Sequence, residues 1–313
     1  MQYRGNWGYS QAERTELLAK LSTHGVEWLR IGVRWASIQP DEPTASDLGR
    51  DPSALSRVDR IIREAHARGF LVSVTFNSTP DWANGGRGPT ALPSDPSDYA
   101  RAVAWMAERY RGQVQSWEIY NEPNNERMLR ATPATYVPVL CAAYRAIHRV
   151  VPDLEVVTGG TSGNDWEWVE GMYEAGAKGC FDVLATHPYQ AKAKPPSHPA
   201  PNDRQWWFQN ISLVREVMLD HHDAGTPVWF TEVGWSTHPG VVRKPGVTLE
   251  QQADYIEELF RFTAEHYPYV ERINWYQARD EPFGDVHRQN FGLFFQDLEP
   301  KPSARRLRNL IVR

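Results

Sequence analysis

The sequence predicts an α/β fold, a single (β/α)8 TIM barrel, from three observations. First, eight short apolar segments alternate with segments of helical spacing, which is typical of parallel strands covered by helices. Second, proline, glycine and aromatic residues concentrate after the strands, whereas the helix-to-strand connections are short. Third, 313 residues suit one such barrel, and no Gly-x-Gly-x-x-Gly or Walker motif follows a strand. An open nucleotide-binding sheet is therefore disfavoured.

The first four strands are predicted from residue alternation and from turn residues at their ends. A helix over residues 11–24 has Ser10 as a plausible N-cap and Gly25 as its stop. The predicted elements in this half are strand 3–9, helix 11–24, strand 26–33, helix 55–68, strand 70–76, helix 96–110 and strand 114–120.

The second half continues the same alternation. Its predicted elements are helix 133–150, strand 154–158, helix 166–175, strand 181–186, helix 204–222, a strand around Trp229, helix 249–266, strand 270–276 and helix 303–311. We therefore expect one catalytic-type domain over residues 1–313, with an extended loop at about 280–302 after the last strand.

Composition excludes several classes of protein. A net charge of −5 and a pI near 6.1 give no electrostatic reason to expect nucleic acid or an anionic membrane as a partner. No apolar run approaches the roughly 18 residues that a membrane span needs. Cys141 and Cys180 are too few for a disulfide framework and lack metal-ligand spacing, so two buried free thiols are the favoured interpretation.

The N-terminal residues contain no apolar stretch of the kind found in signal peptides. The chain enters strand-like sequence at once, so a leader could have been trimmed from it. We expect a secreted or periplasmic protein somewhat more than a cytoplasmic one.

A glutamate lies at or just after the end of each of two predicted strands. Glu122 follows the alternating run 114–120 and precedes a proline, and Glu232 ends the apolar run that begins at Pro227. Two such carboxyl groups suit glycosidic cleavage, in which one protonates the leaving oxygen while the other attacks the sugar carbon or activates water. Thirteen tryptophans fit a carbohydrate cleft, because indole faces stack on sugar rings. The alternative is that both glutamates are solvated loop residues.

The segments Trp-Glu-Ile-Tyr-Asn-Glu-Pro-Asn at 117–124 and Phe-Thr-Glu-Val-Gly-Trp at 230–235 resemble strand-four and strand-seven signatures of retaining clan A glycoside hydrolases. Within that clan the likeness is greatest to the compact, polysaccharide-acting type of family 39. The resemblance implies that Glu122 is the acid/base, Glu232 is the nucleophile and Asn121 binds the sugar 2-hydroxyl. It also implies that no metal or cofactor is needed.

The resemblance assigns further substrate-binding residues. Arg30 lies in the strand-two segment and would keep the nucleophile ionised, with Arg34 as a competitor for that role. His187 and Tyr189 would orient Glu232 and line the subsite beside the scissile bond. Trp275 would form the floor of the sugar subsite, and its alternative is barrel-core packing.

Other aromatic and polar residues are weaker candidates. Each tryptophan among them is as consistent with loop packing as with sugar stacking, and Asn77 could be a polar subsite contact. These candidates are Trp35, Asn77, Trp82, Trp206, Trp207 and Trp235.

Taken together, the sequence predicts a retaining glycosidase that acts as a monomer and cleaves β-linked oligosaccharides or polysaccharides within the glycan chain. Three alternatives remain open. They are an exo-acting β-glycosidase, a transglycosylase with the same catalytic residues, and a carbohydrate-binding barrel without catalytic activity.

Overall fold

The computed structural model describes residues 1–5, 8–190, 193–201, 205–238 and 245–311. Its strands run parallel in two four-stranded sheets, each in chain order. The first sheet contains β1 (Trp28–Arg34), β2 (Leu71–Asn77), β3 (Ser116–Ile119) and β4 (Glu155–Thr158), and the second contains β5 (Thr161–Ser162), β6 (Leu184–His187), β7 (Val228–Val233) and β8 (Val270–Trp275).

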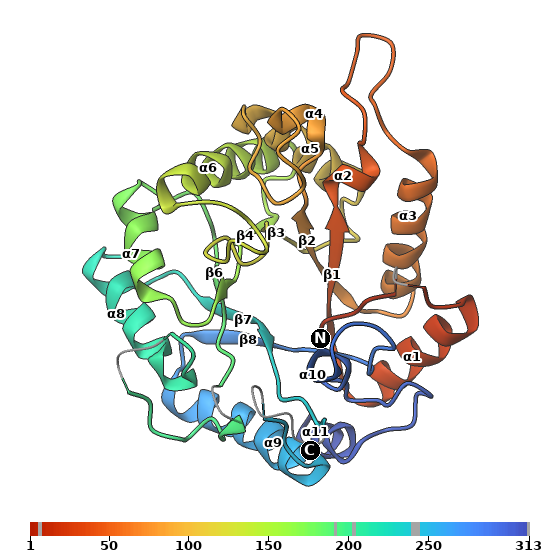
Figure 1. The fold of residues 1–313 in the computed structure, drawn as a ribbon, viewed down its shortest axis with the longest axis vertical. Helices are drawn as coiled ribbons and strands as arrows, with labels where there is room; N and C mark the ends of the chain where they lie inside the picture. Colours follow the sequence, from red (N-terminus) through yellow and green to blue (C-terminus); the bar gives the residue numbers. More distant parts are fainter. Residues whose placement is uncertain (6–7, 191–192, 202–204, 239–244, 312–313) are drawn as a thin grey trace.

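Backbone hydrogen bonds join the two sheets on both sides. On one side, the Thr158 amide at the end of β4 donates to the Val183 carbonyl just before β6, at 3.0 Å. On the other side, Gln2 forms a parallel bridge with Arg30 of β1 and donates to the carbonyl of Trp275 in β8 at 2.9 Å. The strands form a ring surrounded by helices, seen end-on in Figure 1. The predicted (β/α)8 barrel is confirmed.

The helices cover the outside of the ring, except for the short α2, α4 and α10, which lie in loops after strands (Figure 1). Ser10 caps α1 as predicted, because its hydroxyl accepts from the Glu13 amide while the Glu13 carboxylate accepts from the Ser10 amide. The helices are α1 (Gln11–Thr23), α2 (Trp35–Ile38), α3 (Pro52–His66), α4 (Asp81–Asn84), α5 (Pro96–Arg109), α6 (Pro133–Val150), α7 (Trp166–Glu174), α8 (Ile211–Asp220), α9 (Leu249–His266), α10 (Val286–Gln289) and α11 (Pro302–Ile311).

The predicted strand over residues 3–9 is wrong in its position. The pairing that fills this place in the barrel is made around Gln2, and the chain turns at Gly5. Residues 6–7 lie outside the described part of the chain.

The predicted helix over residues 204–222 begins later than expected, and residue 204 itself lies outside the described part. A 3-10 turn at Phe208–Asn210 precedes α8, which begins at Ile211. The Phe208 amide donates to the side-chain oxygen of Gln190 at 2.8 Å. This contact ties the segment to the loop after β6, and a distant side chain of this kind is invisible to helical spacing.

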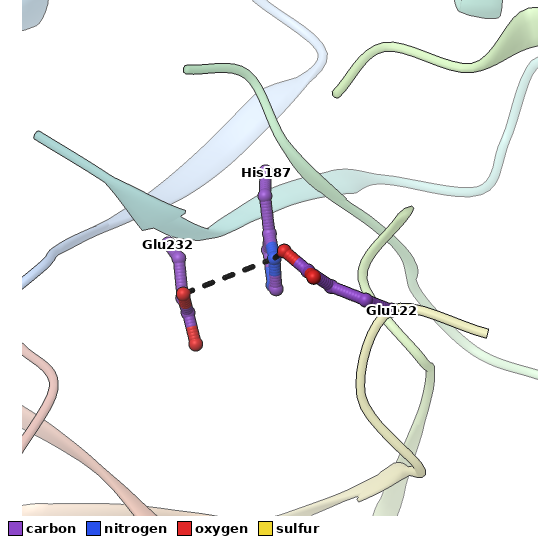
Figure 2. A group of neighbouring side chains, drawn as sticks. All are labelled: Glu122, His187 and Glu232. Carbon is purple, nitrogen blue, oxygen red and sulfur yellow. Dashed lines mark hydrogen bonds and ion pairs between the residues drawn. The ribbon is translucent and has the colours of Figure 1, made fainter. Parts of the chain in front are cut away.

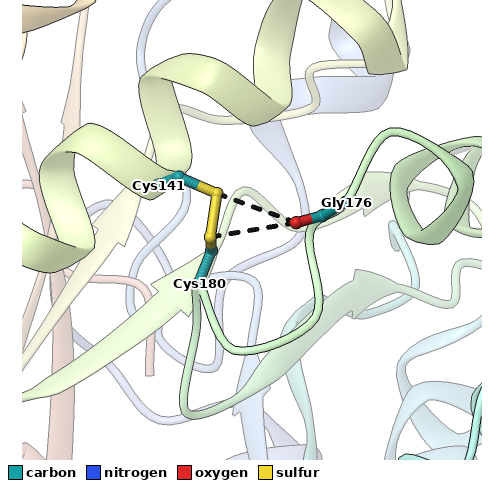
Figure 3. Close-up of a disulfide and its surroundings, with 3 residues drawn as sticks. All are labelled: Cys141, Gly176 and Cys180. Atoms are coloured by element: carbon teal, nitrogen blue, oxygen red, sulfur yellow. Dashed lines mark hydrogen bonds between the residues drawn. A yellow bond between two sulfur atoms is a disulfide. The ribbon is translucent and has the colours of Figure 1, made fainter.

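The prediction of free cysteines is also wrong. Cys141 of α6 and Cys180, which precedes β6, form a disulfide between segments 39 residues apart (Figure 3). Their Cα atoms lie 4.6 Å apart, within the range that a disulfide requires. The bond links two consecutive βα units on the outside of the barrel.

The loops that follow the strands open at the carboxyl end of the barrel, where active sites of this fold lie. The segment after β8 begins at Tyr276. It includes α10 and reaches α11 at Pro302. Among the described helices, none has both the length and the apolar character needed to cross a membrane.

Candidate active site

Glu122 and Glu232 both lie at the carboxyl end of the barrel. Glu232 is the next-to-last residue of β7, and Glu122 follows β3 by three residues. The turn after β3 is unusual because Tyr120 and Glu122 have positive φ angles of 65° and 46°. The Glu122 amide donates to the Gly160 carbonyl at 3.0 Å, which holds this turn against the segment after β4. Such conformations in non-glycine residues cluster at functional sites.

His187, the last residue of β6, stands between the two glutamates (Figure 2). Its Nδ1 is 3.0 Å from Glu122 Oε1 and 3.9 Å from Glu232 Oε2. One possible ligand atom from each of the three residues lies within 4.8 Å of the other two. A divalent cation could bind the same three atoms only by displacing any proton held between His187 and Glu122. The structure therefore brings together three residues that the sequence placed far apart.

Arg30 connects the nucleophile candidate to its neighbours. One guanidinium nitrogen donates to Glu232 Oε1 at 2.5 Å, and the other donates to Asn121 Oδ1 at 2.7 Å. Burial lowers the pKa of Arg30, but the charges of Glu118 and Glu232 outweigh it and raise the pKa above its ordinary value. Arg30 is thus a permanent cation beside Glu232. Its bond to Asn121 also fixes that amide with its NH2 group free to donate elsewhere.

Glu118 was missed by the sequence analysis. This β3 residue is fully buried, and its carboxylate receives two hydrogen bonds from Arg30, at 2.5 and 2.9 Å. It also accepts hydrogen bonds from Thr75 at 2.8 Å, from Thr231 at 3.2 Å and from the Gly160 amide at 3.1 Å. The sequence did contain a signal for such a residue, because an arginine inside an apolar strand requires a buried carboxylate partner.

The carboxyl group of Glu122 is held by polar neighbours. Its Oε2 accepts from Asn125 at 2.9 Å. Burial raises the pKa of Glu122, but the hydrogen bond and charge of His187 and the hydrogen bonds of Asn125 and Ser162 outweigh burial and hold the pKa below its ordinary value.

Tyr189 donates to the second oxygen of Glu232, Oε2, at 3.1 Å. Burial and the charge of Glu232 raise the pKa of Tyr189 well above its ordinary value. The phenol therefore stays protonated and remains a hydrogen-bond donor. Together Arg30 and Tyr189 supply a donor to each oxygen of Glu232.

Trp275 lies in the core and does not form the floor of a sugar subsite, which corrects the sequence-based expectation. Its side chain is 1% exposed and packs against Trp235 in the core, and its indole nitrogen donates to the Phe291 carbonyl at 3.1 Å. The residue that faces the site is the next one. Tyr276 packs edge-on against Tyr189 and Phe291, and the charge of Glu232 contributes to raising its pKa, after burial.

The Tyr276 hydroxyl also accepts a hydrogen bond from the Arg4 guanidinium. Side chains alternate between the two faces along a strand, so the identity of the inward-facing aromatic depends on a register of one residue. The sequence shows both aromatics and does not fix that register.

The weaker candidates are also placed. Trp35 and Trp235 are buried in the core and lie too deep to stack on a sugar, which corrects those two expectations. Trp82 is half-buried and donates to the Gln39 carbonyl at 3.0 Å. Asn77 ends β2 with a half-buried side chain. Trp206 is 42% exposed on the loop before α8, whereas Trp207 is buried.

Comparisons with known proteins identify chains that are similar to this one. The model of the family described as Cellulase (glycosyl hydrolase family 5) matches residues 1–276. The structure of a family 39 glycoside hydrolase from the gut symbiont Bacteroides cellulosilyticus WH2 is similar, with 20% identity and a TM-score of 0.76 over 96% of this chain and 61% of that chain. The family 5, subfamily 18 protein of Streptomyces cattleya, solved in complex with Manβ1-4GlcNAc, has 17% identity and a TM-score of 0.75 over 97% of this chain and 76% of that chain.

Among curated proteins, the chloroplastic "Beta-glucosidase-like SFR2" of Oryza sativa subsp. japonica is 31% identical over 103 residues, which are 32% of this chain and 16% of that protein. This chain thus spans 61% of the family 39 structure and a smaller part of the rice protein that it matches. The structural similarities show a shared barrel fold.

Proposed function

The chain belongs to the cellulase family, glycosyl hydrolase family 5, and from that premise we propose that it is a retaining glycosidase that cleaves β-linked oligosaccharides or polysaccharides with Glu122 and Glu232. The observation that carries the proposal is the placement of the two carboxyl groups. One carboxylate oxygen of Glu122 lies within 4.8 Å of a carboxylate oxygen of Glu232. Retaining enzymes keep their carboxyl groups about 5–5.5 Å apart, whereas inverting enzymes leave about 6.5–9.5 Å for a water molecule.

In the first step Glu232 attacks the anomeric carbon, and Glu122 gives its proton to the leaving oxygen. The donors on Glu232 suit this role. Arg30 keeps the carboxylate ionised, and Tyr189 holds its second oxygen in a fixed direction. The Asn121 amide is positioned to donate to the sugar, where hydrogen bonds that tighten in the transition state contribute several kcal/mol.

In the second step water replaces Glu232 on the sugar. The esterified Glu232 carries no charge, so Glu122 loses the repulsion of its neighbour and accepts a proton from the water. His187 stays in contact with Glu122 through both steps and provides a hydrogen-bonding partner for either protonation state.

We further propose that cleavage occurs within the glycan chain. Trp206 and Phe283 are 42% and 48% exposed on the loops after β6 and β8, at the end of the barrel that carries both glutamates. Exposed aromatic faces at that end can stack on sugar units beyond the scissile bond. An exo-acting β-glycosidase and a transglycosylase remain the alternatives, and product lengths separate all three.

The test is hydrolysis of a panel of aryl β-glycosides and β-linked glucans, mannans and xylans, with the first product anomer read by NMR. Glu122→Ala and Glu232→Ala are measured beside the wild type, and Glu126→Ala, an exposed neighbour in the same loop, is the control. We expect retention of configuration, losses of several orders of magnitude in both variants and wild-type activity in the control.

Rescue by azide shows which glutamate is the acid/base and which is the nucleophile. Azide is expected to restore turnover of activated substrates by both alanine variants, giving a β-glycosyl azide with Glu122→Ala and an α-glycosyl azide with Glu232→Ala. An inverted first product would contradict the two-step mechanism. Full activity in Glu232→Ala would contradict the assignment of the nucleophile. Release of single sugars alone would replace endo with exo action, and products longer than the substrate would indicate transglycosylation.

A further inference from the structure

A continuous run of hydrogen bonds connects Glu118 to Glu122. Two side chains, Thr231 and His187, lie between them. Glu118, Thr231 and His187 are each fully buried, and they come from β3, β7 and β6. Thr231 Oγ1 lies 3.2 Å from Glu118 Oε1 and 3.0 Å from His187 Nε2, and His187 Nδ1 lies 3.0 Å from Glu122 Oε1. None of the proposed chemical steps explains why a threonine hydroxyl and a second carboxylate stand behind the histidine.

The charge on Glu118 sets the direction of these hydrogen bonds. Glu118 accepts two hydrogen bonds from Arg30, and a carboxylate can only accept. A threonine hydroxyl has one hydrogen to donate, and Thr231 is placed to donate it to Glu118. The Thr231 oxygen then meets His187 as an acceptor, so His187 carries a hydrogen on Nε2.

A hydrogen on Nε2 decides what the other ring nitrogen can do. When His187 is neutral, Nδ1 has a lone pair and can accept a hydrogen bond from a protonated Glu122. When the same proton moves across the 3.0 Å gap, His187 becomes a cation beside a carboxylate. The opposite tautomer, with its only hydrogen on Nδ1, could not release that hydrogen to Glu122 without becoming an imidazolate anion.

We infer that Thr231 and Glu118 are positioning residues that hold His187 with its hydrogen on Nε2, so that the proton between His187 and Glu122 is available to the leaving group. This inference rests on the proposed function of Glu122. In cleavage the proton moves from Glu122 to the leaving oxygen as the glycosidic bond breaks. In hydrolysis of the intermediate, one proton returns from water to Glu122, so the proton balance closes over the cycle.

The other groups that face His187 are compatible with this arrangement. Glu232 Oε2 lies 3.9 Å from Nδ1, and a Cβ added to Gly160 would lie 2.4 Å from Nε2, so the backbone packs closely on that side. Glu232 is itself engaged by Arg30 and Tyr189, which leaves Glu122 as the nearer partner of Nδ1.

The test uses leaving groups of different acidity. A 2,4-dinitrophenyl β-glycoside departs without protonation, whereas a phenyl β-glycoside needs the acid. Thr231→Val, which keeps the side-chain shape but removes the hydroxyl, is expected to lose roughly 10–100-fold in kcat/KM on the phenyl substrate and under about 3-fold on the dinitrophenyl substrate. Thr231→Ser retains a hydroxyl and is expected to stay within about 3-fold of the wild type on both.

Thr263→Val is the matched control. Thr263 is a buried threonine on α9, and its hydroxyl has no hydrogen-bond partner among the described residues. Its loss should leave both substrates unchanged. Equal losses on both substrates in Thr231→Val would assign Thr231 a structural role and overturn the inference, and so would no loss on either.

The tautomer can also be read directly in the wild type, with a variant needed only to assign the signal. Nitrogen-15 NMR of labelled histidines, with the His187 signal assigned by its absence in His187→Gln, should show Nε2 protonated at neutral pH. A neutral Nδ1–H ring would overturn the inference. If the wild type cleaves no substrate in the panel, the proposed function fails, while the NMR result still decides the tautomer.

Discussion

Arg30 and Glu118 form a buried ion pair that spans the interior of the barrel from β1 to β3, across the intervening β2. Both side chains are at most 2% exposed, and two hydrogen bonds join them. Breaking a buried pair by removing one charge leaves the other uncompensated, and typically costs about 3–5 kcal/mol. The pair therefore supports both the stability of the barrel and the position of Arg30 on Glu232.

Glu118→Gln should lower the free energy of unfolding by about 3–5 kcal/mol, measured by urea denaturation. It should also lower kcat/KM, because Arg30 loses the anchor that aims it at Glu232. Glu108→Gln is the control, since its pair with Arg111 on the surface is half exposed and should be worth less than about 1 kcal/mol. Equal losses from the two substitutions would show that the buried pair contributes no more than a surface pair.

Gly160→Ala should disrupt the site from the backbone side. A Cβ at this position would lie 2.4 Å from His187 Nε2 and 2.5 Å from Thr231 Oγ1, closer than real contacts allow. We expect a fall in kcat/KM of roughly 100-fold or more, because misplacing groups by about 1 Å can cost that much. Gly225→Ala, where the added atom meets nothing within 4 Å, should keep full activity. An active Gly160→Ala enzyme would mean that His187 can shift without loss.

His187→Gln should raise the pKa of Glu122. In the wild type the pKa lies below the ordinary value of 4.5 despite burial, mainly because of the hydrogen bond and charge of His187. A depressed carboxyl pKa contributes stability above the unfolded-state pKa, and this contribution is lost as the pH falls through the folded-state pKa. Carbon-13 NMR of labelled glutamate, with Glu122→Gln to assign the signal, measures the shift. An unchanged or lowered pKa would show that His187 is not the group that lowers it.

Replacing Cys141 and Cys180 by serine should destabilise the fold without changing the active site. Closing a loop of 39 residues is worth about 4 kcal/mol by the chain-entropy relation. Urea denaturation of the wild type with and without dithiothreitol should show the same loss, and the double-serine variant should not respond to the reductant. No response in the wild type would indicate that the cysteines are not bonded.

Dialysis against EDTA should leave hydrolysis of an aryl glycoside unchanged, since the proposed steps use only carboxyl groups, a histidine and their hydrogen-bonding partners. A loss of activity that added Zn²⁺ or Mg²⁺ restores would show that the atoms of Glu122, His187 and Glu232 hold a cation in the working enzyme.

The sequence predicted those features of the site that depend on local order along the chain. Glu122 closely follows β3 and Glu232 is the next-to-last residue of β7, and the carboxyl ends of parallel strands in a barrel meet at one mouth. Arg30 was predicted to act on the nucleophile, but its second carboxylate partner could not be identified from sequence. Glu118 lies in the middle of a strand, and only the packed barrel shows that its side chain points inward to Arg30.

The features that were missed depend on tertiary packing. Trp275 and Tyr276 are adjacent aromatics, and a register of one residue decides which of them faces the candidate active site. Cys141 and Cys180 lie on different βα units, and their 4.6 Å separation arises only when α6 packs beside the segment before β6. Neither the register nor the separation leaves a signature in local composition.

The bridge around Gln2 has a consequence for the order in which the protein can be assembled. Residues at the start of the chain pair on one side with β1, which is synthesised soon after them, and on the other side with Trp275 at the end of β8. Until β8 has been synthesised, the other strands form an open sheet whose two edges carry unpaired backbone N–H and C=O groups. Such edges are prone to pair with other chains. Nascent chains that stop before residue 275 should therefore recruit chaperones and aggregate, whereas chains that include β8 should be released folded.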